Sequence, residues 1–278
     1  MSERRNFNKE YVEHELHGLE TPLEEKITVF ITGGAAMSFY GLKEATKDID
    51  VVLQNKVEVN VLISALQSLG YKDPHKGLTI NYTRMRASAI LENPDGFRWD
   101  IFEQVVADKL SLSKGMIKRS CKLFNEGNLQ VRLLSKEDIF LLKSVTDRDG
   151  DIDDMGIVAE SGVRWDTIAK ECSLQSSHTD RVWEDALCNR LMDLREKRGI
   201  TAPIEKGICR IADQRILETW IIRRVAEGID TVRDLARESK ENEQVIRRAT
   251  NILARKKMLS IDRSTRPYRL TTRRKGSS

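Results

Sequence analysis

Two short apolar runs near the N-terminus constrain the fold more than any other feature of this sequence. Residues 27–32 (ITVFIT) are apolar and β-branched, which is typical of a buried strand. Gly33-Gly34 ends this run and begins a short helical segment that stops at Gly41, and a second strand, 48–53 (DIDVVL), follows. A strand, a helix and a strand within so short a stretch favour an α/β core.

Further strands are predicted downstream of a helical run at 57–69. The stretches 84–91 and 97–102 are extended in pattern, and the Asn-Pro-Asp-Gly at 93–96 is a strong turn signal between them. These two stretches therefore predict a hairpin. One more short strand is predicted at 129–133.

After this last strand the pattern is helical to about residue 227. Ser135 and Asp138 have the spacing of a capping box, with aspartate in place of the usual Glu or Gln. The fold class predicted from this order is an α/β (α+β) core with a mixed sheet, followed by a helical segment. We assign residues 1–160 to the core and 161–206 to a helical connecting segment.

Residues 207–278 form a third predicted domain with a different pattern. Three helical runs precede two short strands around an Arg-Pro turn, which is the order of a winged helix-turn-helix. In the third run, 241–257, one apolar stripe is predicted from Val245, Ala249, Ile252 and Leu253.

Charge also separates this domain from the rest of the chain. It contains 18 Lys/Arg against 9 Asp/Glu, whereas residues 1–206 contain 29 against 34. A basic domain on an acidic body predicts a polyanionic partner such as tRNA or DNA, the alternative being a solvated basic surface. The candidate nucleic-acid contacts are Arg247, Arg248, Arg255 and Lys256 of the third helical run and Arg266 of the wing.

Composition limits the remaining possibilities. No segment approaches the roughly 18–20 consecutive apolar residues of a membrane span, and the N-terminus lacks the apolar core of a secretory signal. We therefore expect a cytoplasmic protein without a membrane partner. The cysteines are far apart and form no CxxC pair, so neither a zinc site nor a disulfide framework is expected; they are Cys121, Cys172, Cys188 and Cys209.

The second strand carries the central chemical signal. Side chains alternate along a strand, so Asp48 and Asp50 point the same way while Ile49 and Val51 point into the core. Two carboxylates at such a short distance repel each other unless a cation lies between them. Mg²⁺ prefers such oxygen ligands together with substrate phosphates. The Gly-Gly turn at a helix start offers backbone N–H groups to a triphosphate.

A third carboxylate lies on a later predicted strand. Asp100 is the candidate, with Asp95 and Glu103 as nearby alternatives. Three acids on adjacent strands can hold two metals about 4 Å apart, which suits in-line phosphoryl transfer.

These features resemble the signature of the DNA polymerase beta-like nucleotidyltransferase superfamily. The sequence TGGAAMSFYGLKEATKDIDVVL is similar to the small-enzyme branch that includes the AbiEii and MenT toxin-type transferases. LSKEDIFLLKSVTDRDGDIDDM, residues 134–155, resembles the downstream motif of that branch. The likeness covers about residues 25–160.

The resemblance implies a role for each matching residue. Gly33 and Gly34 would hold the triphosphate, and Asp48 and Asp50 would bind both Mg²⁺ (or Mn²⁺) ions. Asp100 would complete the second metal site and help to deprotonate the attacking hydroxyl.

The downstream motif adds candidates for nucleotide binding. Lys143 would contact phosphates, and Arg148, Asp151 and Asp154 would shape the same cleft. The alternatives are an ordinary exposed helix lysine and an acidic helix start. Many superfamily members have Ser where this chain has Gly34, and Ser38 and Thr46 are the candidate substitutes.

Two functional hypotheses follow. In the first, the chain is an enzyme that moves a nucleoside monophosphate from an NTP to an acceptor hydroxyl, releasing pyrophosphate, with a nucleic-acid acceptor such as the tRNA 3′ end. In the second, it is a DNA-binding transcriptional regulator whose transferase domain senses nucleotide or is inactive. The three carboxylates favour the first hypothesis, and Gly34 in place of Ser leaves the second open. The oligomeric state is open.

Overall fold

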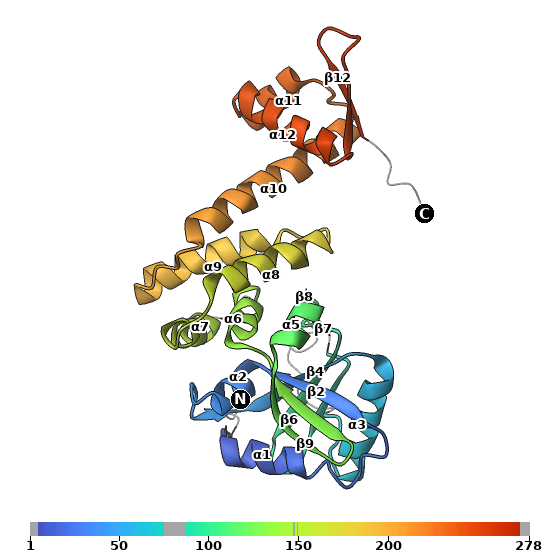
Figure 1. Cartoon of the computed structure of the whole chain (residues 1–278), viewed down its shortest axis with the longest axis vertical. Coiled ribbons are helices and arrows are strands. Elements are labelled where there is room, and N and C mark those ends of the chain that lie inside the picture. Colours follow the sequence, from blue (N-terminus) through green and yellow to red (C-terminus); the bar gives the residue numbers. More distant parts are fainter. Residues whose placement is uncertain (1–4, 75–86, 147, 149, 273–278) are drawn as a thin grey trace.

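The chain extends along one axis in three parts. The computed structural model describes residues 5–74, 87–146, 148 and 150–272. Figure 1 shows a lobe built on a β-sheet at one end, a group of helices in the middle, and a small lobe near the C-terminus at the other end. Among the described residues no helix is long and apolar enough to cross a membrane.

The first lobe is built on a six-stranded mixed sheet. Neighbouring strands are parallel in the pairs β4–β6 and β2–β10 and antiparallel elsewhere, which confirms the predicted α/β core with a mixed sheet. Across the sheet the order is β5 (Ala89–Glu92), β6 (Arg98–Glu103), β4 (Asp48–Leu53), β2 (Ile27–Thr32), β10 (Leu129–Leu133) and β9 (Cys121–Glu126). Part of the predicted stretch 84–91, residues 84–86, lies outside the described residues.

Helices and short strands complete this lobe. They include α1 (Lys9–His17), α2 (Gly33–Phe39) and α3 (Lys56–Ser68), and Asn55 caps α3 through its side chain. The sequence did not predict the edge strand β9, nor β1 (Phe7–Asn8), β3 (Ala45–Thr46), β7 (Val105–Val106), β8 (Leu110–Ser111) or α5 (Lys114–Arg119). Ile49 and Val51 of β4 are fully buried, as their alternation with the aspartates predicts.

Five helices follow the sheet. They are α6 (Lys136–Ser144), α7 (Gly150–Glu160), α8 (Trp165–Ser177), α9 (Trp183–Arg198) and α10 (Glu205–Ala226). Ser135 caps α6, and its hydroxyl donates to the Asp138 carboxylate at 2.7 Å while accepting from the Asp138 N–H. One continuous hydrophobic core runs from the sheet to Ile208, so the packing boundary of the molecule lies within α10.

A disulfide joins α9 to α10. Cys188 and Cys209 form it, with their Cα atoms 5.0 Å apart. The expectation of no disulfide is therefore wrong for this pair. The two cysteines meet because α9 and α10 pack side by side, which their separation of 21 residues does not reveal.

The C-terminal lobe has its own core. Its elements are the end of α10, then α11 (Val232–Ser239), α12 (Glu243–Arg255), and an antiparallel hairpin of β11 (Leu259–Asp262) and β12 (Arg269–Thr272). The apolar stripe predicted for α12 is wrong at Val245, whose residue is 39% exposed. The buried residues of α12 are Ile246, Ala249, Thr250 and Leu253, so Ala249 and Leu253 are buried as predicted, whereas Ile246 and Thr250 replace Val245 and Ile252 on the buried face.

Candidate active site at one edge of the sheet

The sheet brings the three candidate carboxylates to one edge. Asp48 and Asp50 lie at the start of β4, and Asp50 is in register with Asp100 on the parallel strand β6. Side chains in register on neighbouring strands point to the same face. Asp100 is buried, whereas Asp48 and Asp50 are half-buried.

The two alternatives to Asp100 lie elsewhere. Asp95 is in the turn before β6, where its carboxylate accepts a hydrogen bond from the Tyr11 hydroxyl at 2.9 Å. Glu103 is at the far end of β6, in register with Leu53. Of the three acids considered, Asp100 is the one that the strand register puts beside Asp50.

The carboxylate pair has unfavourable electrostatics. Burial, together with the negative charge of Asp48, raises the pKa of Asp50 to about 7, although Arg148 and Lys143 act in the opposite direction. A divalent cation between the two carboxylates would relieve this repulsion.

The donor set is a pair of acids, with no preassembled cage around it. Within the described ranges, no group of three or more His, Cys, Asp or Glu side chains is arranged to hold a metal ion. Mg²⁺ is usually bound through one or two carboxylates, with water and substrate phosphates as its other ligands. The arrangement of Asp48 and Asp50 therefore suits Mg²⁺ bound together with a nucleotide.

The glycine at position 33 is required by the carboxylate beside it. Its φ is +64°, in the left-handed region that favours glycine. A Cβ atom at this position would lie 2.0 Å from Oδ2 of Asp50. Any side chain at residue 33 would therefore displace the Asp50 carboxylate.

Thr46 explains why residue 34 is a glycine. A Cβ atom on Gly34 would lie 2.8 Å from Oγ1 of Thr46, whose hydroxyl donates to the Asp48 carbonyl at 2.9 Å. Thr46 thus occupies the space that a serine at residue 34 would need. Ser38 is buried on α2, and its hydroxyl has no hydrogen-bond partner in the part of the chain that the structure describes.

Lys143 is a buried cation, so the alternative of an ordinary exposed helix lysine is wrong. Its Nζ lies 3.0 Å from Asp151 and 2.6 Å from Asp154. Burial alone lowers the pKa of Lys143, but the two carboxylates outweigh it and hold the pKa above its ordinary value. Lys143 therefore stays charged, and the acidic start of α7 is its counter-charge.

Lys43 is a further cation that sequence reasoning missed. Its Nζ is 3.1 Å from the Asp154 carboxylate and would be 3.8 Å from a Cβ atom on Gly34. It therefore connects the Gly-Gly turn to α7. Its position in the spacer between the Gly-Gly turn and the paired aspartates is the only sequence signal for it.

Arg148 faces the carboxylate pair from the segment between α6 and α7. Its Nε lies 3.0 Å from Oδ2 of Asp151, and its side chain is 63% exposed. Burial lowers the pKa of Arg148, but the charges of Asp151, Asp50 and Asp48 raise it above its ordinary value. The structure thus gathers Lys43, Lys143 and Arg148 around the edge that carries the acids.

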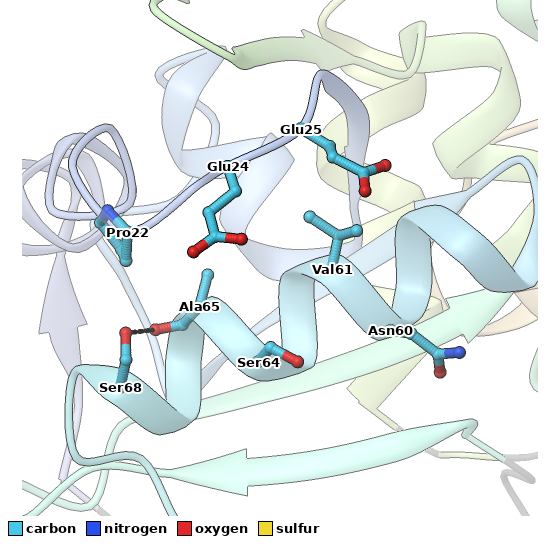
Figure 2. Close-up of a pocket in the computed structure, with 8 residues that line it drawn as sticks. All are labelled: Pro22, Glu24, Glu25, Asn60, Val61, Ser64, Ala65 and Ser68. Atoms are coloured by element: carbon cyan, nitrogen blue, oxygen red, sulfur yellow. Dashed lines mark hydrogen bonds between the residues drawn. The ribbon is translucent and has the colours of Figure 1, made fainter.

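A groove elsewhere on this lobe has the wrong charge for a triphosphate. Figure 2 shows it between the segment 22–25 and α3, with Glu24 and Glu25 above the helix. Its volume is about 320 Å³, and the residues found to line it include these two glutamates and no lysine or arginine. The nucleotide-binding candidates all lie outside it.

In the C-terminal lobe the predicted contacts divide into two groups. Arg247 and Arg266 line a groove of about 460 Å³ between α12 and the β11–β12 hairpin, together with Arg233 and Arg263. Lys256 is instead paired with Glu218 of α10 at 2.7 Å. Arg248 and Arg255 are exposed on α12 but are not among the residues that line the groove.

Comparison with known proteins identifies the class of protein to which this chain belongs. Residues 11–188 match a family described as "Nucleotidyltransferase of unknown function (DUF6036)". The match covers more than half of the 278 residues, so the chain belongs to this family. The description agrees with the resemblance to a nucleotidyltransferase superfamily and supports nucleotidyltransferase activity. No curated protein matches the chain.

Proposed function

We propose that this chain is a metal-dependent nucleotidyltransferase that moves a nucleoside monophosphate from an NTP to an acceptor hydroxyl. The observation that carries the proposal is the crowding at one sheet edge. Burial and the charge of Asp48 raise the pKa of Asp50, Asp100 is in register with Asp50, and the Asp50 carboxylate leaves no room for a side chain at Gly33. We place the chain in the DNA polymerase beta-like superfamily and its AbiEii/MenT-like branch on the sequence resemblance.

Each residue at this edge has a proposed role. Mg²⁺ or Mn²⁺ held by Asp48 and Asp50, with Asp100, would neutralise phosphate charge and make the acceptor hydroxyl more acidic. Asp100 accepts the proton of that hydroxyl.

The turn and the nearby cations hold the triphosphate. Gly33 and Gly34 present backbone N–H groups to it from the turn at the start of α2. Lys143 and Arg148 supply the positive charge that orients the phosphates, and we add Lys43 on the strength of its distance from Gly34. These groups position the α-phosphate for in-line attack.

The C-terminal lobe supplies a proposed grip on the acceptor. We assign α10–α12 and the β11–β12 hairpin to a winged helix that binds a nucleic acid such as tRNA. Four arginines line its groove against one acid, Glu243. Within the described ranges none of the four is ion-paired with a carboxylate, and Arg266 lies over the Tyr268 ring, 4.6 Å from its centroid. We propose that these arginines bind phosphates. NTP and tRNA are cytoplasmic, and we place the proposed activity in the cytoplasm.

The alternative is a DNA-binding transcriptional regulator with a nucleotide-sensing or inactive transferase domain. The basic groove is as compatible with this alternative as with the enzyme. Gly34 in place of serine does not favour the alternative, because Thr46 occupies the space that a serine would need and the three carboxylates are all present. Incubation with α-labelled NTPs, Mg²⁺ and bulk cellular RNA separates the two. Label on RNA supports the enzyme, and no label together with tight duplex-DNA binding supports the regulator.

A further inference from the structure

Arg190 reaches from α9 into the segment that carries Arg148. Its side chain is 12% exposed. Nε and Nη2 both donate to the Thr146 carbonyl, at 3.1 and 2.5 Å, and Nη2 also donates to the Arg148 carbonyl at 3.2 Å. One guanidinium therefore holds two backbone carbonyls of the connection between α6 and α7.

These two residues are linked to the candidate site through their side chains. The Thr146 hydroxyl donates to Asp151, the acid that also pairs with Lys143 and with Arg148. The Arg148 charge in turn acts on the carboxylate pair at the sheet edge. Arg190 itself makes its ion pair with Asp193, one turn further along α9, at 3.4 Å.

We infer that Arg190 is a positioning residue, which fixes the backbone at Thr146 and Arg148 so that the Arg148 guanidinium meets the triphosphate. This inference rests on the proposed nucleotidyltransferase function. The planar guanidinium suits the role because its fixed fork donates to two acceptors at once, whereas an ammonium is a single point of charge. Lysine at this position is therefore expected to restore the charge and little of the function.

A purely structural role makes a different prediction. If Arg190 only fastens α9 to the connection between α6 and α7, its loss lowers stability and leaves nucleotide affinity unchanged. If it acts through Arg148, its loss weakens NTP binding and has no further effect once Arg148 has been removed. A double-mutant cycle on NTP affinity measures this difference directly.

The experiment is calorimetry of NTP binding with Mg²⁺, using the full chain. Arg190→Ala and Arg148→Ala should each weaken binding roughly tenfold, and the double variant should be no weaker than Arg148→Ala alone. Arg198→Ala is the matched control, since it removes another arginine of α9 and its ion pair with Asp153 of α7, yet touches neither carbonyl. This control should bind NTP as the wild type does.

The outcomes separate the inference from the proposed function. Full additivity of the two single effects, or wild-type affinity in Arg190→Ala, overturns the inference while the proposed function stands. Absence of metal-dependent NTP binding in the wild type overturns both. Should Arg190→Ala fail to fold, Arg190→Lys replaces it in the cycle, and an affinity equal to that of the wild type again rejects the inference.

Discussion

At the scale of single residues, the Asp50 carboxylate makes the stability of the metal-free protein depend on pH. Its pKa rises from 3.8 to about 7 on folding, so between these values the folded state binds more protons than the unfolded state. Stability therefore falls as the pH rises from about 4 to 7, and the full cost remains above that range.

Asp50→Asn should remove this cost. In EDTA at pH 8 the variant is expected to be more stable than the wild type by about 2 kcal/mol, after allowance for solvent screening at a half-buried site. The gain should be smaller at pH 5. Thermal unfolding at the two pH values checks it, with Asp95→Asn as a control outside the pair. A variant that is less stable than the wild type at pH 8 would show that Asp50 is not under electrostatic strain.

Gly34 and Thr46 should behave as a coupled pair. Gly34→Ser introduces a Cβ atom 2.8 Å from Oγ1 of Thr46, so we expect it to destabilise the protein by about 1–3 kcal/mol. Adding Thr46→Ala removes the contacting atom and should recover part of that loss. Urea unfolding of the two single variants and the double variant gives the coupling free energy. Strict additivity would show that Thr46 does not exclude a side chain at residue 34.

At the scale of whole elements, a buried carboxylate fastens α8, α9 and α10 together. Glu184 of α9 is fully buried, accepts from the hydroxyls of Ser173 and Ser176, and lies 3.2 Å from Nε of Arg215 on α10. A buried carboxylate is costly without its cation.

Arg215→Ala should therefore destabilise the chain by about 2 kcal/mol, because the two hydroxyls still satisfy part of the charge. Arg210→Ala is the matched control on the same helix, being exposed, and should change stability by less than about 0.5 kcal/mol. Chemical denaturation measures both variants. Equal effects would mean that the ion pair contributes nothing specific.

Some elements could be predicted from the sequence because their signal is local. The runs 27–32, 48–53 and 129–133 match β2, β4 and β10 residue for residue, since each is short, has clear ends and places apolar residues at the positions that face the core. The two-residue strands β1 and β3 have no periodicity to detect. The phase of α12 was missed at Val245 because several stripes fit one amphipathic helix, and only packing against its own lobe selects among them.

Some residues of the candidate site could likewise be predicted from the sequence, and others could not. The common orientation of Asp48 and Asp50 can be predicted from the alternation of side chains within one strand. The position of Asp100 can be predicted because a single neighbouring strand, β6, brings it beside Asp50. Lys43 and Arg190 contact the site only through tertiary packing against Asp154 and against the carbonyls of Thr146 and Arg148. No spacing in the sequence specifies such contacts.

At the scale of the whole molecule, nucleic-acid binding by the C-terminal lobe should depend steeply on salt. Each phosphate contact contributes a log–log slope near −0.9 on duplex DNA and −0.7 on single strands. Arg247→Glu with Arg266→Glu reverses two charges in the groove and should weaken binding and flatten the slope. Lys206→Glu with Arg210→Glu makes the same change of net charge outside the groove and should do neither.

Salt titrations against tRNA and duplex DNA measure these slopes. NTP affinity should be unchanged in both double variants, because the candidate active site lies in the other lobe. If the wild type binds neither nucleic acid at low salt, the proposal that this lobe binds a nucleic acid is wrong, and a protein partner becomes the better hypothesis.

The central claim is that the carboxylates of β4 carry out nucleotidyl transfer. The most direct test follows pyrophosphate release and label transfer from α-labelled NTPs to bulk RNA in Mg²⁺, for the wild type, Asp48→Asn, Asp50→Asn and the control Asp95→Asn. We predict activity in the wild type and the control, and a loss of at least about a hundredfold in the other two, with all four proteins folded. Near-normal turnover by Asp48→Asn or Asp50→Asn would contradict the assignment of the site.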